Sequence, residues 1–226
     1  MDSLNQQIPE EFLDFLNFCV ENTNMSETLG RDQDGYQVNM IHWASEKGYI
    51  QVVKKLLDSG VNSNTPAHHQ SMTPLHYASR NGHLEVVRLL LNSKANVNYQ
   101  SIDKYTPLHF ASLDNHLEVA KLLIQNKANI DYQDYRNHTP LHHASANGNF
   151  ELAELLIENR ADVNCQNKRD LTPLHYASLF GHFEVANLLL KKGAHTSIRD
   201  FRRNNAIEVA LHAKENEIFR MIIYQS

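Results

Sequence analysis

One tetrapeptide, Thr-Pro-Leu-His, occurs four times along the chain at a constant spacing of 33 residues. Each copy is followed by a variable residue, then by Ala and Ser, and the copies begin at Thr73, Thr106, Thr139 and Thr172. A fixed period of this length marks an array of small units that bury their apolar faces only by stacking on one another. The chain is therefore predicted to form one elongated array.

The rest of each unit repeats together with the tetrapeptide. The position that follows the first helix is kept as glycine in three copies and is asparagine in one: Gly82, Asn115, Gly148 and Gly181. Two degenerate copies flank the four, at residues 39–44 (Asn-Met-Ile-His-Trp-Ala) and at residues 205–210 (Asn-Ala-Ile-Glu-Val-Ala). The first lies 34 residues before its neighbour, and the extra residue falls in the loop segment 64–69, which tolerates an insertion.

The residue types predict two helices in each unit. Thr is a good N-cap, and Pro suits the first helical position, where its missing N–H costs nothing. The Gly that ends this helix takes a positive φ, and Asn is the next most tolerant residue there. An apolar i, i+3, i+4 pattern, as over residues 84–91, then predicts a second, amphipathic helix.

The second helix is expected to end at a further position of positive φ. Gly60 and Gly193 suit this position, whereas Lys94, Lys127 and Arg160 do not. A residue other than glycine costs about 1–2 kcal/mol in this conformation. The three central units are therefore predicted to be less stable than an idealised array.

With four full matches to T-P-L-H-x-A at this period, residues 34–226 resemble the ankyrin repeat family. The resemblance implies an all-α fold, an ankyrin-repeat solenoid of helix-turn-helix units with β-hairpin loops and about six repeats. The expected segments are 1–33 for an N-terminal cap helix and lead-in, then repeats at 34–67, 68–100, 101–133, 134–166, 167–199 and 200–226, the first and last of them degenerate. An apolar pattern from Glu10 to Glu21 predicts the cap helix.

Charge and apolar content argue against several classes of function. The 21 basic and 26 acidic residues give a net charge of −5, which disfavours nucleic-acid binding. The apolar runs are too short for a membrane span, and the N-terminus lacks the features of a signal peptide. The two cysteines, Cys19 and Cys165, indicate a reducing compartment. The expected location is the cytoplasm, and also the nucleus, with no nucleic-acid or membrane partner.

The 14 histidines raise the question of metal or catalytic chemistry. In the family the motif histidine bonds the backbone of a neighbouring loop, which implies structural roles for His42, His76, His109, His142 and His175. Loop or cap roles are expected for His83, His116 and His182. The pairs His68-His69 and His142-His143 lack the spacing of a helical zinc site. No catalytic motif appears, so we expect no enzymatic activity, no cofactor and no metal.

The resemblance also implies a protein partner, which would bind a concave face built from the hairpin tips and the exposed side of the first helices. Aromatic residues and Arg, the types enriched in binding hot spots, are frequent at these positions. The candidate surface comprises Trp43, Tyr77, Arg80, Tyr105, Phe110, Leu113, Tyr135, Arg136, His143, Arg169, Leu171, Tyr176, Leu179, Phe180, Phe201, Arg202 and Arg203.

Two groups within this surface admit a second interpretation. The aromatic residue after each motif histidine suits either partner binding or packing between repeats. Leu179 and Phe180 predict an exposed apolar patch beside Leu171 and Phe201, with extra packing on the last unit as the alternative. A basic rim, and with it a salt-sensitive association, is expected from Lys168, Arg169, Arg202 and Arg203.

Together these features predict a stand-alone, non-enzymatic binding module that acts as an adaptor, scaffold or inhibitor and is a monomer on its own. A narrower resemblance, to gankyrin-type assembly chaperones of the proteasome regulatory particle, provides the alternative. It is carried by residues 31–35 (Arg-Asp-Gln-Asp-Gly) ahead of residues 42–44 (His-Trp-Ala). An enzyme is the second alternative, and no motif supports it.

One modification is also suggested by the sequence. Residues 162–164 (Asp-Val-Asn), which follow Leu156, resemble the context in which asparagines of ankyrin repeats are hydroxylated. Asn164 is therefore a candidate hydroxylation site. The alternative is a hairpin asparagine that bonds its own backbone.

Overall fold

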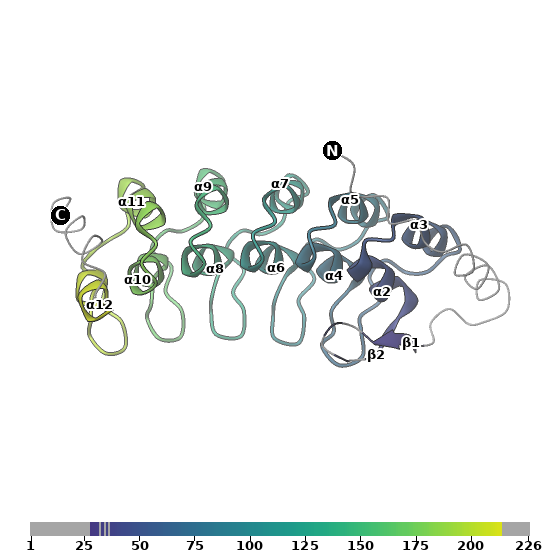
Figure 1. Ribbon diagram of the computed structural model, residues 1–226, viewed down its shortest axis with the longest axis horizontal. Helices are drawn as coiled ribbons and strands as arrows, with labels where there is room; N and C mark the ends of the chain where they lie inside the picture. Colours follow the sequence, from purple (N-terminus) through teal and green to yellow (C-terminus); the bar gives the residue numbers. More distant parts are fainter. Residues whose placement is uncertain (1–27, 32, 34, 36, 214–226) are drawn as a thin grey trace.

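The computed structural model describes residues 28–31, 33, 35 and 37–213, and the predicted cap helix from Glu10 to Glu21 lies outside them. Within these residues, pairs of helices repeat along one axis in two rows (Figure 1). The first row consists of α2 (Met40–Lys47), α4 (Pro74–Arg80), α6 (Pro107–Leu113), α8 (Pro140–Ala146), α10 (Pro173–Leu179) and α12 (Ala206–His212). The second row consists of α3 (Ile50–Asp58), α5 (Leu84–Asn92), α7 (Leu117–Gln125), α9 (Phe150–Glu158) and α11 (Phe183–Lys191).

A continuous apolar core joins the units. The leucines of the four tetrapeptides are fully buried: Leu75, Leu108, Leu141 and Leu174. Their cluster extends from Met40 in α2 to Ala210 in α12. The predicted all-α solenoid of stacked units is confirmed, and no helix in the described part of the chain has the length and apolar content that crossing a membrane requires.

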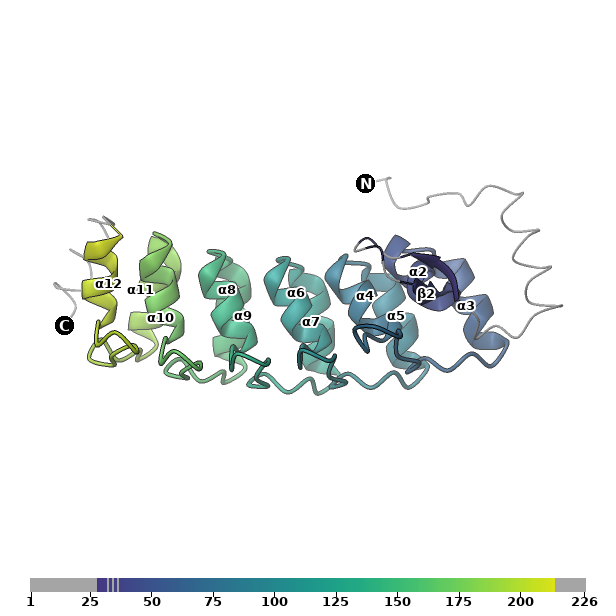
Figure 2. The same cartoon turned by 90° about the horizontal axis from the view of Figure 1, so that it is seen from below.

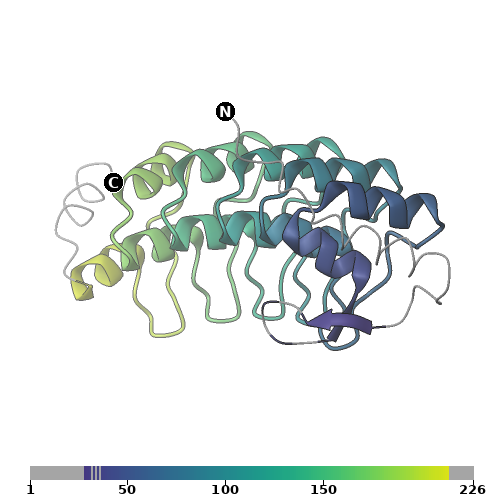
Figure 3. The ribbon, with the colours of Figure 1, turned by 45° about the vertical axis from the view of Figure 1, so that its right-hand side comes forward.

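A short antiparallel ribbon precedes the first helix pair. β1 (Thr28–Arg31) pairs with β2 (Gln37–Asn39), and the register is irregular between Thr28 and Gly30. Because β2 leads directly into α2, the ribbon ties the lead-in segment to the first unit (Figure 3). Sequence analysis did not predict this pairing, since such short strands show too little alternation to be recognised.

In the four units with the full tetrapeptide, the motif histidine fixes the start of the first helix and contacts the next unit. His109 Nδ1 accepts the backbone N–H of Thr106 at 3.1 Å and its hydroxyl at 2.8 Å. The ring proton must then be on Nε2, which donates to the carbonyl oxygen of His138 in the following loop at 3.1 Å. The other motif histidines make the same contact with the next loop at 2.8–3.3 Å, which confirms their structural role.

This arrangement requires a neutral ring, and burial accordingly lowers the pKa of His76 to about 4. Between pH 6.5, the ordinary value, and pH 4, the unfolded chain binds a proton here that the folded chain does not. The free energy of unfolding should therefore fall as the pH drops through this window, by about 1.4 kcal/mol per pH unit for this residue. Urea titrations from neutral to acidic pH check this, with His76→Gln giving a shallower pH slope. Equal slopes for the two proteins would contradict it.

Glycine at the end of a first helix also makes room for the following unit. The three predicted cap residues, His83, His116 and His182, precede second helices and donate from Nε2 to carbonyl oxygens of the preceding unit at 2.7–2.9 Å. A Cβ on Gly48 would come within 2.6 Å of the His83 ring. Where Asn115 replaces the glycine, the next unit carries Asn149, whose amide donates to the Ser112 carbonyl oxygen at 3.2 Å.

The second helices are followed by the left-handed residues that the sequence predicts. The angle φ is 64° at Lys94, 67° at Lys127 and 73° at Arg160, and it is 90° at both Gly60 and Gly193. A side chain at these angles crowds its own backbone. The strain therefore occurs in the three central units.

Replacing Arg160 by Gly should relieve this strain. We expect a gain of about 1 kcal/mol, which raises the thermal midpoint by about 2–4 °C in an array of this size. Circular dichroism during heating measures it. Glu154→Gly within α9 is the control and should lower the midpoint, because glycine weakens a helix interior. An Arg160→Gly midpoint at or below the wild-type value would contradict the prediction.

Asparagine side chains link the loops that follow the second helices. Asn98 Oδ1 accepts the backbone N–H of Asn129 at 2.8 Å, while its Nδ2 donates to the Lys127 carbonyl oxygen at 3.2 Å. The same pair of bonds is made by Asn64 and Asn164. The carboxylate of Asp131 at the fourth such position accepts a backbone N–H at 3.2 Å but has no amide to donate. Burial, together with the charge of Asp162, raises its pKa.

Asp131→Asn should therefore stabilise the array. The new amide can donate to the next unit, and the repulsion from Asp162 disappears. Because the loop is exposed, we expect the free energy of unfolding to rise by about 0.5 kcal/mol, which is the low end of what one hydrogen bond contributes. The reciprocal variant Asn98→Asp should lose a similar amount, and urea midpoints of both variants test the pair. A shift of the two midpoints in the same direction would show that the amide donor is not the cause.

Candidate functional site

From the second unit onward, the aromatic residue after the motif histidine lies between units. Its ring meets the edge of the motif histidine of the preceding unit, in the pairs His42–Tyr77, His76–Phe110, His109–His143 and His142–Tyr176, with centroids 5.6–5.9 Å apart. Tyr77 is only 1% exposed and packs with Val38 and Met72, so its predicted place on the binding surface is wrong. The structure supports the packing interpretation of this stripe.

Other predicted contact residues are only partly accessible. Phe110 stacks on Tyr105 with centroids 5.2 Å apart, and the guanidinium of Arg80 lies 5.7 Å from the Phe110 ring centroid. The remaining half-buried positions of the predicted surface are Trp43, Leu113, His143, Leu171 and Tyr176. A partner could touch only the outer edges of these side chains.

The hairpin loops ahead of the first helices form a ladder, visible along the edge of the array in Figure 2. Backbone N–H groups donate to the carbonyl oxygen of the preceding loop at 2.9–3.0 Å, from Ile102, Tyr135, Lys168 and Phe201. The five hairpins ahead of α4, α6, α8, α10 and α12 each contain one residue with φ between 51° and 68°: Ser71, Lys104, Asn137, Asp170 and Arg203. Sequence analysis missed these turn positions, because none of them is glycine. The ladder holds neighbouring tips in fixed relative positions.

Exposed aromatic rings at the tips are accompanied by arginines. The Arg136 guanidinium lies 5.0 Å from the ring centroid of Tyr135. Phe201 is 51% exposed and has Arg169 at 5.7 Å and Arg202 at 5.2 Å from its ring centroid. Five residues of the predicted surface therefore form two cation–π groups on the hairpin ladder.

The predicted apolar patch consists of two separate groups. Leu179 and Phe180 are 39% and 52% exposed, as expected, and Phe180 stacks on Tyr176 at 6.2 Å. Phe183, at the start of α11, is a further exposed apolar residue that sequence analysis missed. Phe201, however, lies on the hairpin ladder, which is at the N-terminal end of α10. Phe180 follows the C-terminal end of this helix, about 10 Å away. The prediction of a single patch was therefore wrong.

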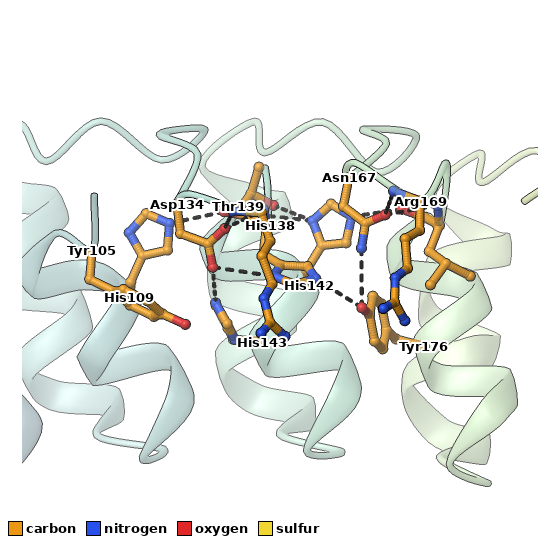
Figure 4. A network of polar contacts seen from close by, with 12 residues as sticks. Tyr105, His109, Asp134, His138, Thr139, His142, His143, Asn167, Arg169 and Tyr176 are labelled. Atoms are coloured by element: carbon orange, nitrogen blue, oxygen red, sulfur yellow. Dashed lines mark hydrogen bonds and ion pairs between the residues drawn. The ribbon is translucent and has the colours of Figure 1, made fainter. Parts of the chain in front are cut away.

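A polar network lies behind the tips and joins neighbouring units (Figure 4). Asp134 Oδ1 accepts two backbone N–H groups of its own loop at 2.7 and 2.8 Å. Asp134 Oδ2 lies 3.2 Å from His138 Nδ1 and 3.4 Å from His143 Nε2. His138 Nε2 is 2.8 Å from the hydroxyl oxygen of Tyr176, which accepts the amide of Asn167 at 3.1 Å.

The network keeps one buried carboxylate ionised. Burial alone would raise the pKa of Asp134, but the hydrogen bonds of His138 and the 3.4 Å contact with His143 outweigh it and hold the pKa well below the ordinary value. Burial raises the pKa of Tyr105, and the nearby charge of Asp134 adds to this rise. The site therefore combines a fixed negative charge with neutral phenols.

Sequence analysis did not find this cluster. The sequence neighbours His142 and His143 lack the spacing of a helical zinc site, and their rings have different partners. The fold instead brings His143, on a first helix, to the loop residues Asp134 and His138. The sequence did contain a signal for this cluster. Four units have the full tetrapeptide, and only the unit of Thr139 has Asp and two additional histidines at these three positions.

Asn164, the candidate modification site, bonds the next unit. Its Oδ1 accepts the His195 N–H at 2.8 Å, and its Nδ2 donates to the Gly193 carbonyl oxygen at 3.2 Å. The alternative, that its side chain bonds its own backbone, is therefore wrong; its backbone N–H is bonded by Asp162 Oδ1 at 2.9 Å. Hydroxylation of Asn164 stays a prediction.

A family model of ankyrin repeats in three copies matches residues 10–101, 41–134, 94–167 and 126–200. These overlapping matches cover most of the chain. The chain belongs to the ankyrin repeat family. No curated protein matches this ankyrin array.

The expected likeness to gankyrin-type chaperones is not shown by the family match. Within the ankyrin array, His42 bonds the next loop and Ala44 is buried, as the corresponding residues of other units are. His42 and Ala44 therefore have the general structural roles of their repeat positions.

Proposed function

We propose that the ankyrin array binds a partner protein through its hairpin tips and the exposed end of α10. Ankyrin repeats indicate a protein–protein interaction module, and this proposal adds the surface. The observation that carries it is the set of exposed cation–π groups, Tyr135 with Arg136 and Phe201 with Arg169 and Arg202. Aromatic rings and guanidinium groups that remain accessible in the folded chain are typical of binding hot spots.

The charge of the tips favours an acidic partner segment. Although the chain has a net charge of −5, bases are concentrated on the hairpins: Lys104, Arg136, Lys168, Arg169, Arg202 and Arg203. The exposed acids of the same hairpins are Asp103 and Asp170. A partner with acidic residues around an apolar anchor would complement this surface, and salt would weaken the association.

The ladder between hairpins supports binding at low entropic cost. Neighbouring tips are already joined by backbone hydrogen bonds of 2.9–3.0 Å. Little ordering is then needed when the partner arrives. Action as an adaptor, scaffold or inhibitor without catalysis fits this design, and the monomeric state and the cytoplasmic and nuclear location stay predictions.

Affinity capture with a matched pair of variants tests the surface. In the tip variant, Arg169→Glu, Phe201→Ala and Arg202→Glu remove one cation–π group. The control, Lys54→Glu with Lys191→Glu, makes the same charge change on the second row of helices. We expect partners that wild type and control capture at low salt to be lost from the tip variant, because its anchor and charges are gone, and to be released from wild type by high salt. Mass spectrometry quantifies them.

Partners kept by the tip variant and lost from the control would place binding on the second row and contradict the proposal. Leu179→Glu with Phe180→Glu then reports whether the end of α10 contributes. Thermal unfolding of each variant confirms that it is folded before its capture is compared.

A further inference from the structure

The network of Figure 4 holds a set of atoms suited to a metal ion. Asp134 Oδ2, His138 Nδ1 and His143 Nε2 all lie within 4.8 Å of one another. We propose that these three atoms bind one zinc ion, with a water molecule as the fourth ligand. The inference is independent of the partner surface.

The distances already match two edges of a zinc tetrahedron. Zinc bonds imidazole nitrogen and carboxylate oxygen at about 2.0–2.1 Å, which separates neighbouring ligand atoms by about 3.3–3.4 Å. Asp134 Oδ2 lies 3.2 Å from the His138 nitrogen and 3.4 Å from the His143 nitrogen. The two nitrogens lie within 4.8 Å of each other, and rotation of the rings about their side-chain bonds can set the third edge.

The hairpin itself does not need this set of residues. The loop requires one side-chain oxygen to accept its N–H groups, and Asp134 Oδ1 supplies it. Ser101 does the same with one hydroxyl, toward Tyr105 N–H at 3.1 Å, and Asn167 does it with one amide oxygen, toward Leu171 N–H at 3.1 Å. The loop therefore does not need the second carboxylate oxygen of Asp134, whose contacts are with His138 and His143.

The two histidines are equally unnecessary for the repeat. The position of His138 is Tyr105 in the preceding unit and Leu171 in the following one. The position of His143 is Phe110 and Tyr176 in the same two units. Among the four units with the full tetrapeptide, the combination of one Asp and two His at these positions occurs once.

Two groups in the cluster have an unmet electrostatic need. His143 Nε2 is buried and makes no hydrogen bond, although it points toward Asp134. In the part of the chain that the structure describes, the ion-pair contacts of the buried Asp134 carboxylate are with histidines, and no Lys or Arg joins them. A divalent cation between these groups would satisfy both, because it neutralises the carboxylate and accepts the nitrogen lone pair.

The surrounding residues are placed to support a bound ion. A metal-binding histidine usually donates its second N–H to a polar neighbour, which fixes the ring. His138 Nε2 lies 2.8 Å from the Tyr176 hydroxyl oxygen. Without metal, His138 Nδ1–H faces Asp134 and the Tyr176 hydroxyl donates to Nε2. With zinc on Nδ1, the proton moves to Nε2 and Tyr176 becomes the acceptor, which makes it a positioning residue.

Calorimetric titration of the chelator-stripped full chain with zinc chloride tests the site. The site variant Asp134→Asn, His138→Leu, His143→Tyr carries the residues of the following unit, so each already suits its place in the fold. The control His68→Ala, His195→Ala removes two exposed histidines instead. We expect one tight zinc equivalent in wild type and control and none in the site variant. Tyr176→Phe should weaken binding by about 10–100-fold.

Two further readouts separate the site from weak surface binding. Zinc should raise the thermal midpoint of wild type and leave the site variant unchanged, since a ligand stabilises only the state that binds it. Cobalt chloride should give the intense visible absorption of four-coordinate cobalt in wild type alone. Zinc binding of equal affinity in wild type and site variant, no tight binding in wild type, or loss of binding in the control would overturn the proposal.

Discussion

The array depends on one interaction, the neutral imidazole that bonds in two directions at once. Through Nδ1 it closes the first turn of its own helix, and through Nε2 it holds the loop of the next unit, as His109 does between Thr106 and His138. Local structure and stacking are therefore stabilised by the same side chain. A unit that lacked its neighbour would leave buried ring nitrogens unbonded, which makes folding of adjacent units cooperative.

This repeated framework frees other positions for function. The loop needs one acceptor oxygen, and the remaining atoms of each hairpin vary from unit to unit without cost to the fold. The exposed rings and guanidinium groups occupy such variable positions at the hairpin tips. Asp134 and its two histidines occupy variable positions behind the tips. Partner binding and metal binding would thus share one scaffold without sharing residues.

Features set by short stretches of sequence could be predicted well. The helices, the Thr-Pro starts and the left-handed residues Lys94, Lys127 and Arg160 depend on sterics within a few residues, which the repeat displays several times. Features set by distant contacts could not. The burial of Tyr77 results from packing with Val38 and Met72, and the Asp134 cluster forms only when a helix is placed against a loop. To predict that Phe180 and Phe201 lie apart, one must know which end of α10 each residue is near.

The junctions between units also carry information about order. Gly48, Gly82 and Gly148 each accept a histidine ring from the following unit, whereas Asn115 faces the smaller Asn149. If the unit after Asn115 had His in place of Asn149, the imidazole ring would collide with the Asn115 side chain. If a unit after a glycine had Asn in place of its histidine, the space that the ring fills would stay empty. The glycine junctions are alike, but the Asn115 junction differs from them, so a shift by one unit would set Asn115 against His182 and Gly82 against Asn149. A nascent or crowded array is thereby guarded against pairing one unit out of step, whether within one chain or between two copies.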